Sequence, residues 1–296
     1  MVIQMNIIIK YFLKIIQKLN LDKVVYFVAR TRFSNFFLSY FWDAKQNFNY
    51  FETIYNSYKK LINKKKLSLK NKKVLELGCG SSIGPGYFFI KDGIKNWVGI
   101  EKFNEFDKKF NIELIKMVIK KYPSKNYSSF FDSNFKINPK NMKFVQSDFI
   151  DFNTKEKFDC IFSNAVLEHV DKNVIEQTIQ KINSLLVTGG YAIHAIDLRD
   201  HFNFDNPFNF YKYPEKEWNK LTKGTIMYTN RLRAKDFIEL FKKNGFKLVY
   251  IKENIQQDKI NNLKISDFFS KYSQKELSVE DIQVIYKKTR GFYELA

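Results

Sequence analysis

The stretch of the sequence that is most informative about chemistry is a glycine turn after a short apolar run. Val74–Leu77 has the pattern of a buried strand, and Gly78-Cys79-Gly80 follow directly. Glycines at such a turn let the backbone approach a ligand closely. A dinucleotide-binding loop would place its third glycine at Ile83, but Gly84 comes one residue late. Glu76 would also repel a pyrophosphate, so the pattern favours a positively charged ligand, such as a sulfonium that carries an α-amino group.

Polar side chains also end the next predicted strands. Glu101 follows the strand expected at 97–100, and Asp148 follows the one at 143–146. In an open parallel sheet, ligands bind beyond the carboxyl ends of the strands. We therefore expect these carboxylates to share one site with the glycine turn.

All three histidines of the chain occur in or after the fourth and fifth predicted strands. These are His169, His194 and His201. A hydroxyl acceptor needs a base because a neutral alcohol is a poor nucleophile. We expect His201, His169, His194 and Asp197 as candidate catalytic residues. The alternatives are a structural His169 and a satisfied core residue at His194.

Asp197, Asp200 and His201 could hold a divalent metal ion. Their spacing is not a recognised ligand pattern. We therefore predict no metal site from the sequence.

An aromatic insertion spans about residues 201–233. The sequence favours a lid over the acceptor, with Phe208 and Tyr211 as contacts. Arg231 and Arg233 could grip a phosphate or carboxylate of that acceptor. The alternative is a satellite aromatic cluster under a long loop.

The elements that position these residues alternate between strands and helices. Such alternation predicts an α/β fold with a mostly parallel sheet covered on both faces. We expect strands near 74–77, 97–100, 143–146, 158–162, 191–196, 246–251 and 282–286, and helices at 106–121, 173–186 and 234–243. Residues 1–66 form a predicted helical extension that ends in a solvated lysine-rich linker, and residues 67–296 form the catalytic domain.

Four strand-end motifs, in this order, resemble those of the class I S-adenosylmethionine-dependent methyltransferases. The resemblance covers about residues 73–250 and implies a Rossmann-like, seven-stranded sheet whose last strand, 282–286, is antiparallel. The motifs are Glu76-x-Gly78-x-Gly80, Glu101, Ser147-Asp148-Phe149, and Phe158 to Val170.

The resemblance implies a role for each motif. Glu101 would hold the ribose hydroxyls, Asp148 the adenine amino group, and Phe149 would cover the adenine ring. The residues expected at S-adenosylmethionine are Glu76, Gly78, Cys79, Gly80, Glu101, Lys102, Asp148, Phe149 and Asn164. The insertion and residues 228–233 also resemble methyltransferases of bacterial surface-glycan pathways.

The chain carries a formal charge of +19, with 50 Lys and Arg against 31 Asp and Glu. Because the lysines are scattered through every segment, the charge gives no strong nucleic-acid signal. Two cysteines exclude a disulfide framework and fit a cytoplasmic protein. Lysines at positions 10, 14 and 18 interrupt the apolar N-terminus, which argues against a membrane span. A helix over residues 1–20 could lie on the inner membrane face or pack on its own domain.

The sequence thus favours a methyltransferase that acts on a small-molecule, glycan or lipid-linked acceptor. An RNA or protein methyltransferase is the alternative suggested by charge. A non-catalytic binding protein is the third possibility, although the intact motif residues argue against it. The sequence does not determine the oligomeric state.

Overall fold

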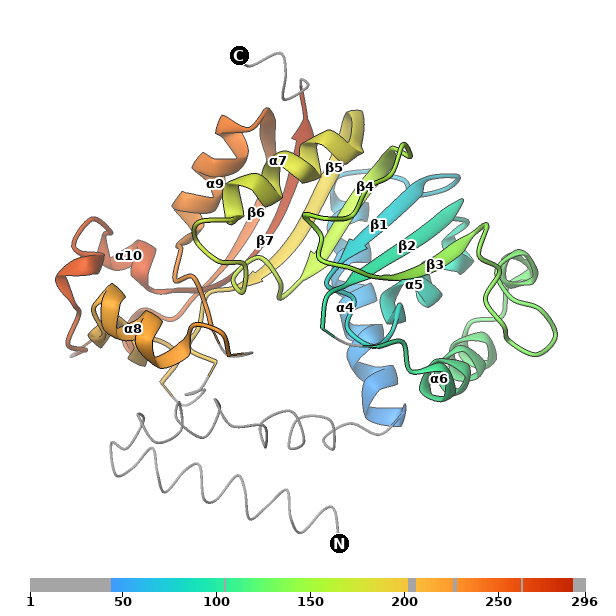
Figure 1. Cartoon of the computed structure of the whole chain (residues 1–296), viewed down its shortest axis with the longest axis horizontal. Coiled ribbons are helices and arrows are strands. Elements are labelled where there is room, and N and C mark those ends of the chain that lie inside the picture. Colours follow the sequence, from blue (N-terminus) through green and yellow to red (C-terminus); the bar gives the residue numbers. More distant parts are fainter. Residues whose placement is uncertain (1–43, 104, 202–205, 226–227, 262, 290–296) are drawn as a thin grey trace, which may run out of the picture.

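A seven-stranded sheet forms the centre of the protein. The computed structural model describes residues 44–103, 105–201, 206–225, 228–261 and 263–289. The strand order is β3-β2-β1-β4-β5-β7-β6, and β7 is antiparallel to both neighbours. The predicted α/β class and its antiparallel last strand are therefore confirmed (Figure 1). The strands are β1 (Lys73–Leu77), β2 (Asn96–Glu101), β3 (Met142–Gln146), β4 (Phe158–Asn164), β5 (Leu186–Asp197), β6 (Phe246–Ile255) and β7 (Val279–Lys288).

Helices cover both faces of this sheet (Figure 1). One buried apolar cluster joins α4, α5 and α6 to Trp97 and Phe162, while a second joins α7 and α9 to Leu75 and Val284. Both faces of the central strands are therefore buried, as expected for parallel strands. The α-helices are α4 (Ala44–Lys64), α5 (Gly84–Phe89), α6 (Lys108–Lys121), α7 (Ile175–Leu185), α8 (Glu215–Thr222), α9 (Ala234–Lys243) and α10 (Gln274–Leu277). Short 3-10 turns occur at Ile90–Asp92, Lys125–Ser129, Asn209–Lys212, Gln257–Lys259 and Asp267–Phe269.

Helix α4 belongs to the packed domain. Its buried residues recur at intervals of three and four, so they form one stripe along the helix: Phe48, Phe51, Tyr55, Tyr58 and Ile62. This stripe packs against α5 and α6. The prediction of a solvated lysine-rich linker is wrong for residues 59–64. The helix continues to Lys64, and Lys59 Nζ lies 2.9 Å from Asp92 Oδ2. The boundary near residue 66 stays a prediction, and residues 1–43 lie outside the described part.

Strand register brings the motif residues to one edge. Leu77 pairs with Ile100 of β2 and with Ser163 of β4, and Asn164 pairs with Ala195 of β5. Glu101, at the end of β2, pairs with Gln146 at the end of β3. Because these strands are parallel and in step, the turns that follow them open at the same edge.

A third, smaller cluster lies beside the sheet. It consists of aromatic residues from the insertion and of residues 260–277: Phe208, Phe210, Tyr211, Tyr213, Trp218, Ile260, Phe269, Tyr272 and Leu277. We call this the satellite cluster. Helices α8 and α10, on the left of Figure 1, enclose it.

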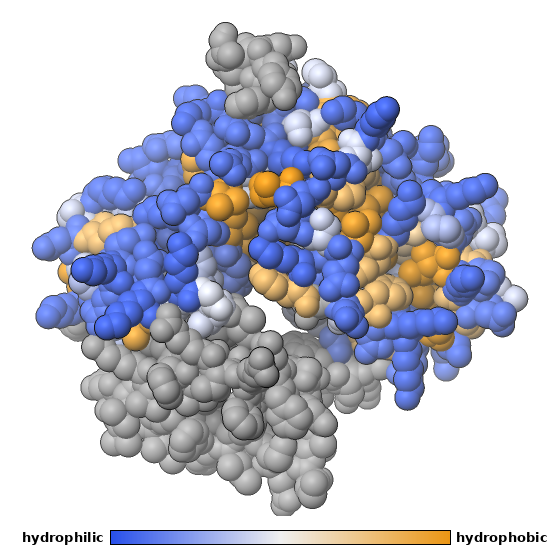
Figure 2. Space-filling view, in the orientation of Figure 1, coloured by the Kyte–Doolittle hydropathy of each residue, from blue (hydrophilic) through white to orange (hydrophobic). Residues whose placement is uncertain are grey.

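The outer surface is mostly hydrophilic. Figure 2 shows hydrophilic residues over most of the described part on this face, with smaller apolar patches between them. No helix among the described residues is long and apolar enough to cross a membrane.

Candidate functional site

The glycine turn after β1, which we call the donor loop (residues 78–83), has a backbone conformation that residues other than glycine rarely adopt. Gly78 and Gly80 have φ angles of +69° and +65°. A Cβ at Gly78 would lie 2.5 Å from Val166, whereas one at Gly80 would meet nothing within 4 Å among the described residues. Gly78 is therefore needed for packing, and Gly80 borders open space that a ligand could fill.

The late third glycine has a separate reason. Gly84 begins α5, and a Cβ there would lie 2.4 Å from the ring of Phe51 in α4. Cys79 packs just as closely, since a Cβ at Gly99 would lie 2.8 Å from its sulfur. Burial raises the pKa of the Cys79 thiol, so this thiol stays protonated. Only the backbone of Cys79 remains suited to a ligand.

Glu76 lies buried beneath the donor loop, next to a second carboxylate. The indole N–H of Trp97 donates a hydrogen bond to Glu76 Oε2 at 3.0 Å. Burial raises the pKa of Glu76 to about 8, the Trp97 hydrogen bond opposes this shift, and the charge of Glu101 adds to it. A cation bound here would stabilise both carboxylates, so the site fits a ligand with a sulfonium and an ammonium group.

Glu101 links the donor loop to the end of β2. Its carboxylate accepts hydrogen bonds from Gly80 N–H at 2.9 Å and from Phe103 N–H at 2.8 Å. Lys102, the next residue, reaches Asp148 after β3 with an Nζ–Oδ2 distance of 2.6 Å. Burial alone would raise the pKa of Asp148, but Lys102 and the Ile150 N–H hold it below its ordinary value. Three of the predicted cofactor residues thus surround one edge.

Phe149 is placed differently from the expectation. Its ring is buried in the cluster with α7 and α9 rather than standing free over a ligand. Phe103, two residues after Glu101, is instead 78% exposed. Phe103 was not among the residues expected from the sequence. Its position two residues after Glu101, the motif residue of β2, was the signal that could have indicated it.

Tyr50 of α4 was missed as well. Asn164 donates from Nδ2 to the Tyr50 hydroxyl at 3.3 Å. Burial and the charges of Glu76 and Glu168 raise the pKa of Tyr50. Its hydroxyl therefore lies where the donor half and the acceptor half of the site meet. No motif in α4 could have indicated this, because the contact is purely tertiary.

The structure corrects the catalytic expectation for His194. The ring is fully buried, hydrogen-bonded through Nδ1 to Ser163 Oγ at 2.7 Å and packed on Phe241. Burial lowers the pKa of His194 to about 3. His194 faces inward from the middle of β5, so it is a core residue.

The other candidates come together at the ends of β4 and β5. We call Glu168, His169, Asp197 and His201 the acceptor cluster. The rings of His169 and His201 lie 4.8 Å apart, and His201 Nε2 is 3.5 Å from Asp197 Oδ2. Glu168, which the sequence analysis did not select, accepts a hydrogen bond from the Asp197 N–H at 3.2 Å. The dipeptide Glu168-His169 after β4 was the sequence signal that could have indicated this residue.

Electrostatics differ sharply within this cluster. Burial lowers the pKa of His169 to about 4 and raises that of Glu168 to about 8. Burial alone would lower the pKa of His201, but neighbouring carboxylates, chiefly Asp197, raise it above its ordinary value. Asp197 is held ionised by Arg199, which approaches it at 2.7 and 2.9 Å. At neutral pH the cluster can therefore exchange a proton through His201 or Glu168.

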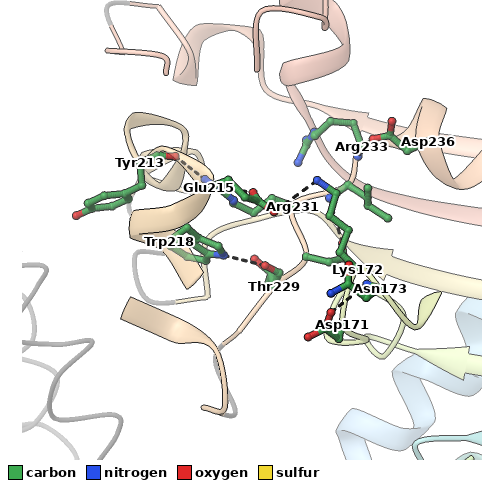
Figure 3. Close-up of polar contacts among 12 residues, drawn as sticks. Asp171, Lys172, Asn173, Tyr213, Glu215, Trp218, Thr229, Arg231, Arg233 and Asp236 are labelled. Atoms are coloured by element: carbon green, nitrogen blue, oxygen red, sulfur yellow. Dashed lines mark hydrogen bonds and ion pairs between the residues drawn. The ribbon is translucent and has the colours of Figure 1, made fainter. Parts of the chain in front are cut away.

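Arg231 and Arg233 are not placed to grip an acceptor, which corrects that expectation. Arg231 points into the insertion, donating to the Tyr213 carbonyl at 2.6 Å and pairing with Glu215 at 2.6 Å (Figure 3). Arg233 is completely buried and donates to the carbonyls of Leu198 and Val279. Both guanidinium groups crosslink the loops around the satellite cluster.

Phe208 and Tyr211 also differ from the predicted lid. Both are fully buried, stacked on each other at 5.6 Å, and the Tyr211 hydroxyl donates to the Leu277 carbonyl at 2.7 Å. Residues 257–277, which the sequence analysis did not include, supply the opposite wall, including Phe269. The alternative of a satellite cluster is therefore confirmed.

Several solved structures are similar to this chain. N-methyltransferase NodS from Bradyrhizobium japonicum in complex with S-adenosyl-L-homocysteine is 14% identical, with a TM-score of 0.40 over 76% of this chain and 81% of that one. An S-adenosylmethionine-dependent methyltransferase from Clostridium acetobutylicum is 12% identical, with a TM-score of 0.47 over 80% and 91%. One from Methanosarcina mazei is 14% identical, with a TM-score of 0.44 over 74% and 93%. No curated protein sequence matches the chain.

The family itself is identified from the sequence. A methyltransferase domain model matches residues 50–251, which begins inside α4 and ends within β6. The match covers the donor loop, the four strand-end motifs and the acceptor cluster. The chain therefore belongs to the methyltransferase domain family and is a methyltransferase, with S-adenosylmethionine as the cofactor that its donor loop fits.

Proposed function

We propose that this methyltransferase methylates a hydroxyl group of a small-molecule or glycan acceptor. The observation that supports the proposal is the acceptor cluster, whose Glu168 follows two residues after Val166, the side chain that packs against Gly78 of the donor loop. An amine needs only to arrive unprotonated, whereas a hydroxyl requires such groups. The end of β4, Ser163-Asn164-Ala165-Val166, also lacks the Asn/Asp-Pro-Pro-aromatic pattern typical of amino-group methylation on nucleic-acid bases.

The donor half has a defined task in this proposal. S-adenosylmethionine supplies a methyl group on positively charged sulfur. Glu76 would face the positive charge, Glu101 would exchange its backbone partners for ribose hydroxyls, and Asp148 would meet the adenine amino group. The exposed ring of Phe103 would replace Phe149 as the cover of the adenine.

The acceptor half must orient a hydroxyl and take its proton. Alignment and a short approach to the methyl carbon account for most of the acceleration in such a displacement. We assign the acceptor proton to His201 or Glu168, whose pKa values are both raised. Tyr50, between the two halves, would hold the acceptor oxygen in place.

Titration of the purified chain with S-adenosylmethionine by calorimetry tests the donor half. We expect Glu101→Ala to weaken binding by about 1–3 kcal/mol, because ribose hydroxyls would lose a charged acceptor. Lys108→Ala, in the first turn of α6, is a control on a nearby charge. Unchanged affinity in Glu101→Ala would remove this residue from the site, and no binding at millimolar ligand would contradict the donor assignment.

A second candidate is an RNA or protein acceptor, which the charge of +19 favours. An assay of S-adenosylhomocysteine release with hydroxyl-bearing sugars and small molecules distinguishes the two candidates, because turnover with these acceptors would favour the first. Turnover with RNA, together with RNA affinity that falls steeply with salt, would favour the second candidate.

A further inference from the structure

Three potential metal ligands come together in the acceptor cluster. Glu168 and His169 follow β4, and His201 follows β5. One ligand atom from each lies within 4.8 Å of the other two. Tetrahedral metal–ligand bonds of about 2.0–2.2 Å place ligand atoms about 3.4 Å apart, so these atoms would need to approach by at most about 1.4 Å, which side-chain rotations can provide.

Glu168 carries a buried oxygen that lacks a partner. The residue is 1% exposed, and its Oε1 accepts the Asp197 N–H. Oε2 has no hydrogen-bond partner among the described residues. A buried carboxylate oxygen of this kind is costly unless a cation or a donor reaches it.

His169 is oriented in the way that metal-bound histidines are. Its Nδ1 lies 2.7 Å from the Tyr228 carbonyl, which can only accept, so Nδ1 carries the proton. The lone pair is then on Nε2, away from the carbonyl. An outer hydrogen bond to a backbone carbonyl fixes this tautomer in many metal sites.

His201 faces the same space from the opposite loop. Its Nε2 is buried and without a hydrogen bond to any described residue, and Asp197 lies beyond it at 3.5 Å. Asp197 is itself held by Arg199. The negative charge of Asp197 beside this imidazole would favour a bound cation.

We propose that Glu168, His169 and His201 form a binding site for a divalent transition-metal ion. Two imidazole nitrogens and one carboxylate oxygen suit Zn²⁺, whereas Mg²⁺ and Ca²⁺ prefer oxygen ligands alone. Sequence spacing did not indicate these ligands, because they come from two loops 32 or 33 positions apart.

Three protein ligands leave a coordination position for another molecule. Val166, two residues before Glu168, packs against the Cα of Gly78, so this position is near the donor loop. Resting on the proposed function, we infer that an acceptor oxygen occupies it. The ion would then lower the pKa of the acceptor hydroxyl, whose proton would leave to water, and His201 and Glu168 would act as ligands in place of the proton acceptors assigned above.

Titration of the chelator-treated full chain with Zn²⁺ tests the site without any acceptor. We expect stoichiometric binding, a rise in melting temperature with Zn²⁺, and a Co²⁺ absorption spectrum typical of mixed nitrogen and oxygen ligands. His201→Ala and Glu168→Gln should each weaken Zn²⁺ binding at least tenfold, the lower end of what even outer-shell changes cost.

Asp171→Asn is the matched control, because this carboxylate is in the same loop but pairs with Lys223 at 2.8 Å. Its Zn²⁺ affinity should equal that of the unchanged chain. Circular dichroism checks the fold of each variant, and the Co²⁺ spectrum of the unchanged chain reports the ligands if a variant unfolds. Equal Zn²⁺ affinity in all folded variants, or no stoichiometric binding, would overturn the site. Binding of S-adenosylmethionine, measured separately, would still test the donor half of the proposed function.

Discussion

At the residue scale, two buried glutamates define the two halves of the site. Glu76 lies beneath the donor loop and Glu168 belongs to the acceptor cluster, and burial raises the pKa of each to about 8. Neither has a cationic side chain that forms an ion pair with it among the described residues. A protein keeps such carboxylates buried when a ligand or ion provides the missing charge.

The ionisation of Glu76 should make donor binding depend on pH. The ionised form favours a cationic ligand, and its fraction rises as the pH increases through about 8. We therefore expect S-adenosylmethionine affinity to rise from pH 6 to 8, with at most about a tenfold gain per pH unit, and then level off. Calorimetry from pH 6 to above pH 8 measures this affinity.

Glu76→Gln is the control for this dependence. Any pH effect that remains in the variant belongs to the ligand amino group. An identical pH profile for Glu76→Gln and the unchanged chain would contradict the role of Glu76.

His201 and His194 should respond oppositely to substitution. His201→Ala should lower kcat by about 10²–10⁴-fold, the usual contribution of acid–base groups, without changing S-adenosylmethionine affinity. His194→Gln should instead lower the free energy of unfolding by about 1–3 kcal/mol, because a buried hydrogen bond to Ser163 is disturbed. Steady-state kinetics and urea denaturation separate the two effects. A large loss of kcat in a fully folded His194→Gln would restore His194 as a catalytic candidate.

At the element scale, α4 and the loop of residues 228–233 hold the site together from two sides. The Tyr58 hydroxyl of α4 donates to the Ser163 carbonyl at 2.5 Å, at the end of β4. On the other side, Asn230 donates to the carbonyls of Leu167 and Val170 at 2.8 and 3.0 Å. The turn that carries Glu168 and His169 is thereby fixed between elements distant in sequence.

The contact between α4 and α5 gives a test of this packing. Gly84→Ala should destabilise the protein by about 1–3 kcal/mol, because the new methyl group would overlap the Phe51 ring. Phe51→Leu makes room, so the double variant should lose less stability than the sum of the two single variants. Urea denaturation measures all four chains. Strict additivity would show that the overlap is relieved without strain.

At the scale of the whole molecule, the positive charge is spread over a hydrophilic surface rather than concentrated in one patch of the sequence. Phosphate-rich partners would contact such a surface weakly and with strong salt dependence. Residues 1–20 carry an amphipathic basic pattern, and they lie outside the described part of the chain. Peripheral contact with the inner membrane face therefore remains a proposal.

Flotation with liposomes tests that contact. We expect the full chain to float with anionic vesicles and a chain lacking residues 1–20 to remain below, because a basic amphipathic helix binds anionic lipid. Neutral vesicles serve as the control and should carry less protein. Equal flotation of both chains, or none, would exclude residues 1–20 as a membrane contact.

The sequence by itself determined the sheet, the order of its motifs and the donor loop. These depend on local patterns: apolar runs of strand length, glycines after them, and carboxylates at strand ends. All seven predicted strands and the three predicted helices exist. Residues 1–43 lie outside the described part of the chain.

Only the tertiary structure decided the acceptor half. Arginine is a residue type that binds anions, so Arg231 and Arg233 were candidates for the acceptor site. In the structure both are buried and donate hydrogen bonds to backbone carbonyls, so their role is structural. The roles proposed for Tyr50, Phe103 and Glu168 depend on α4, β2 and β4 coming together, as the contact of Asn164 with Tyr50 illustrates. Such contacts depend on which loops fold against each other, and that choice is made by packing over the whole chain rather than by the spacing of residues along it.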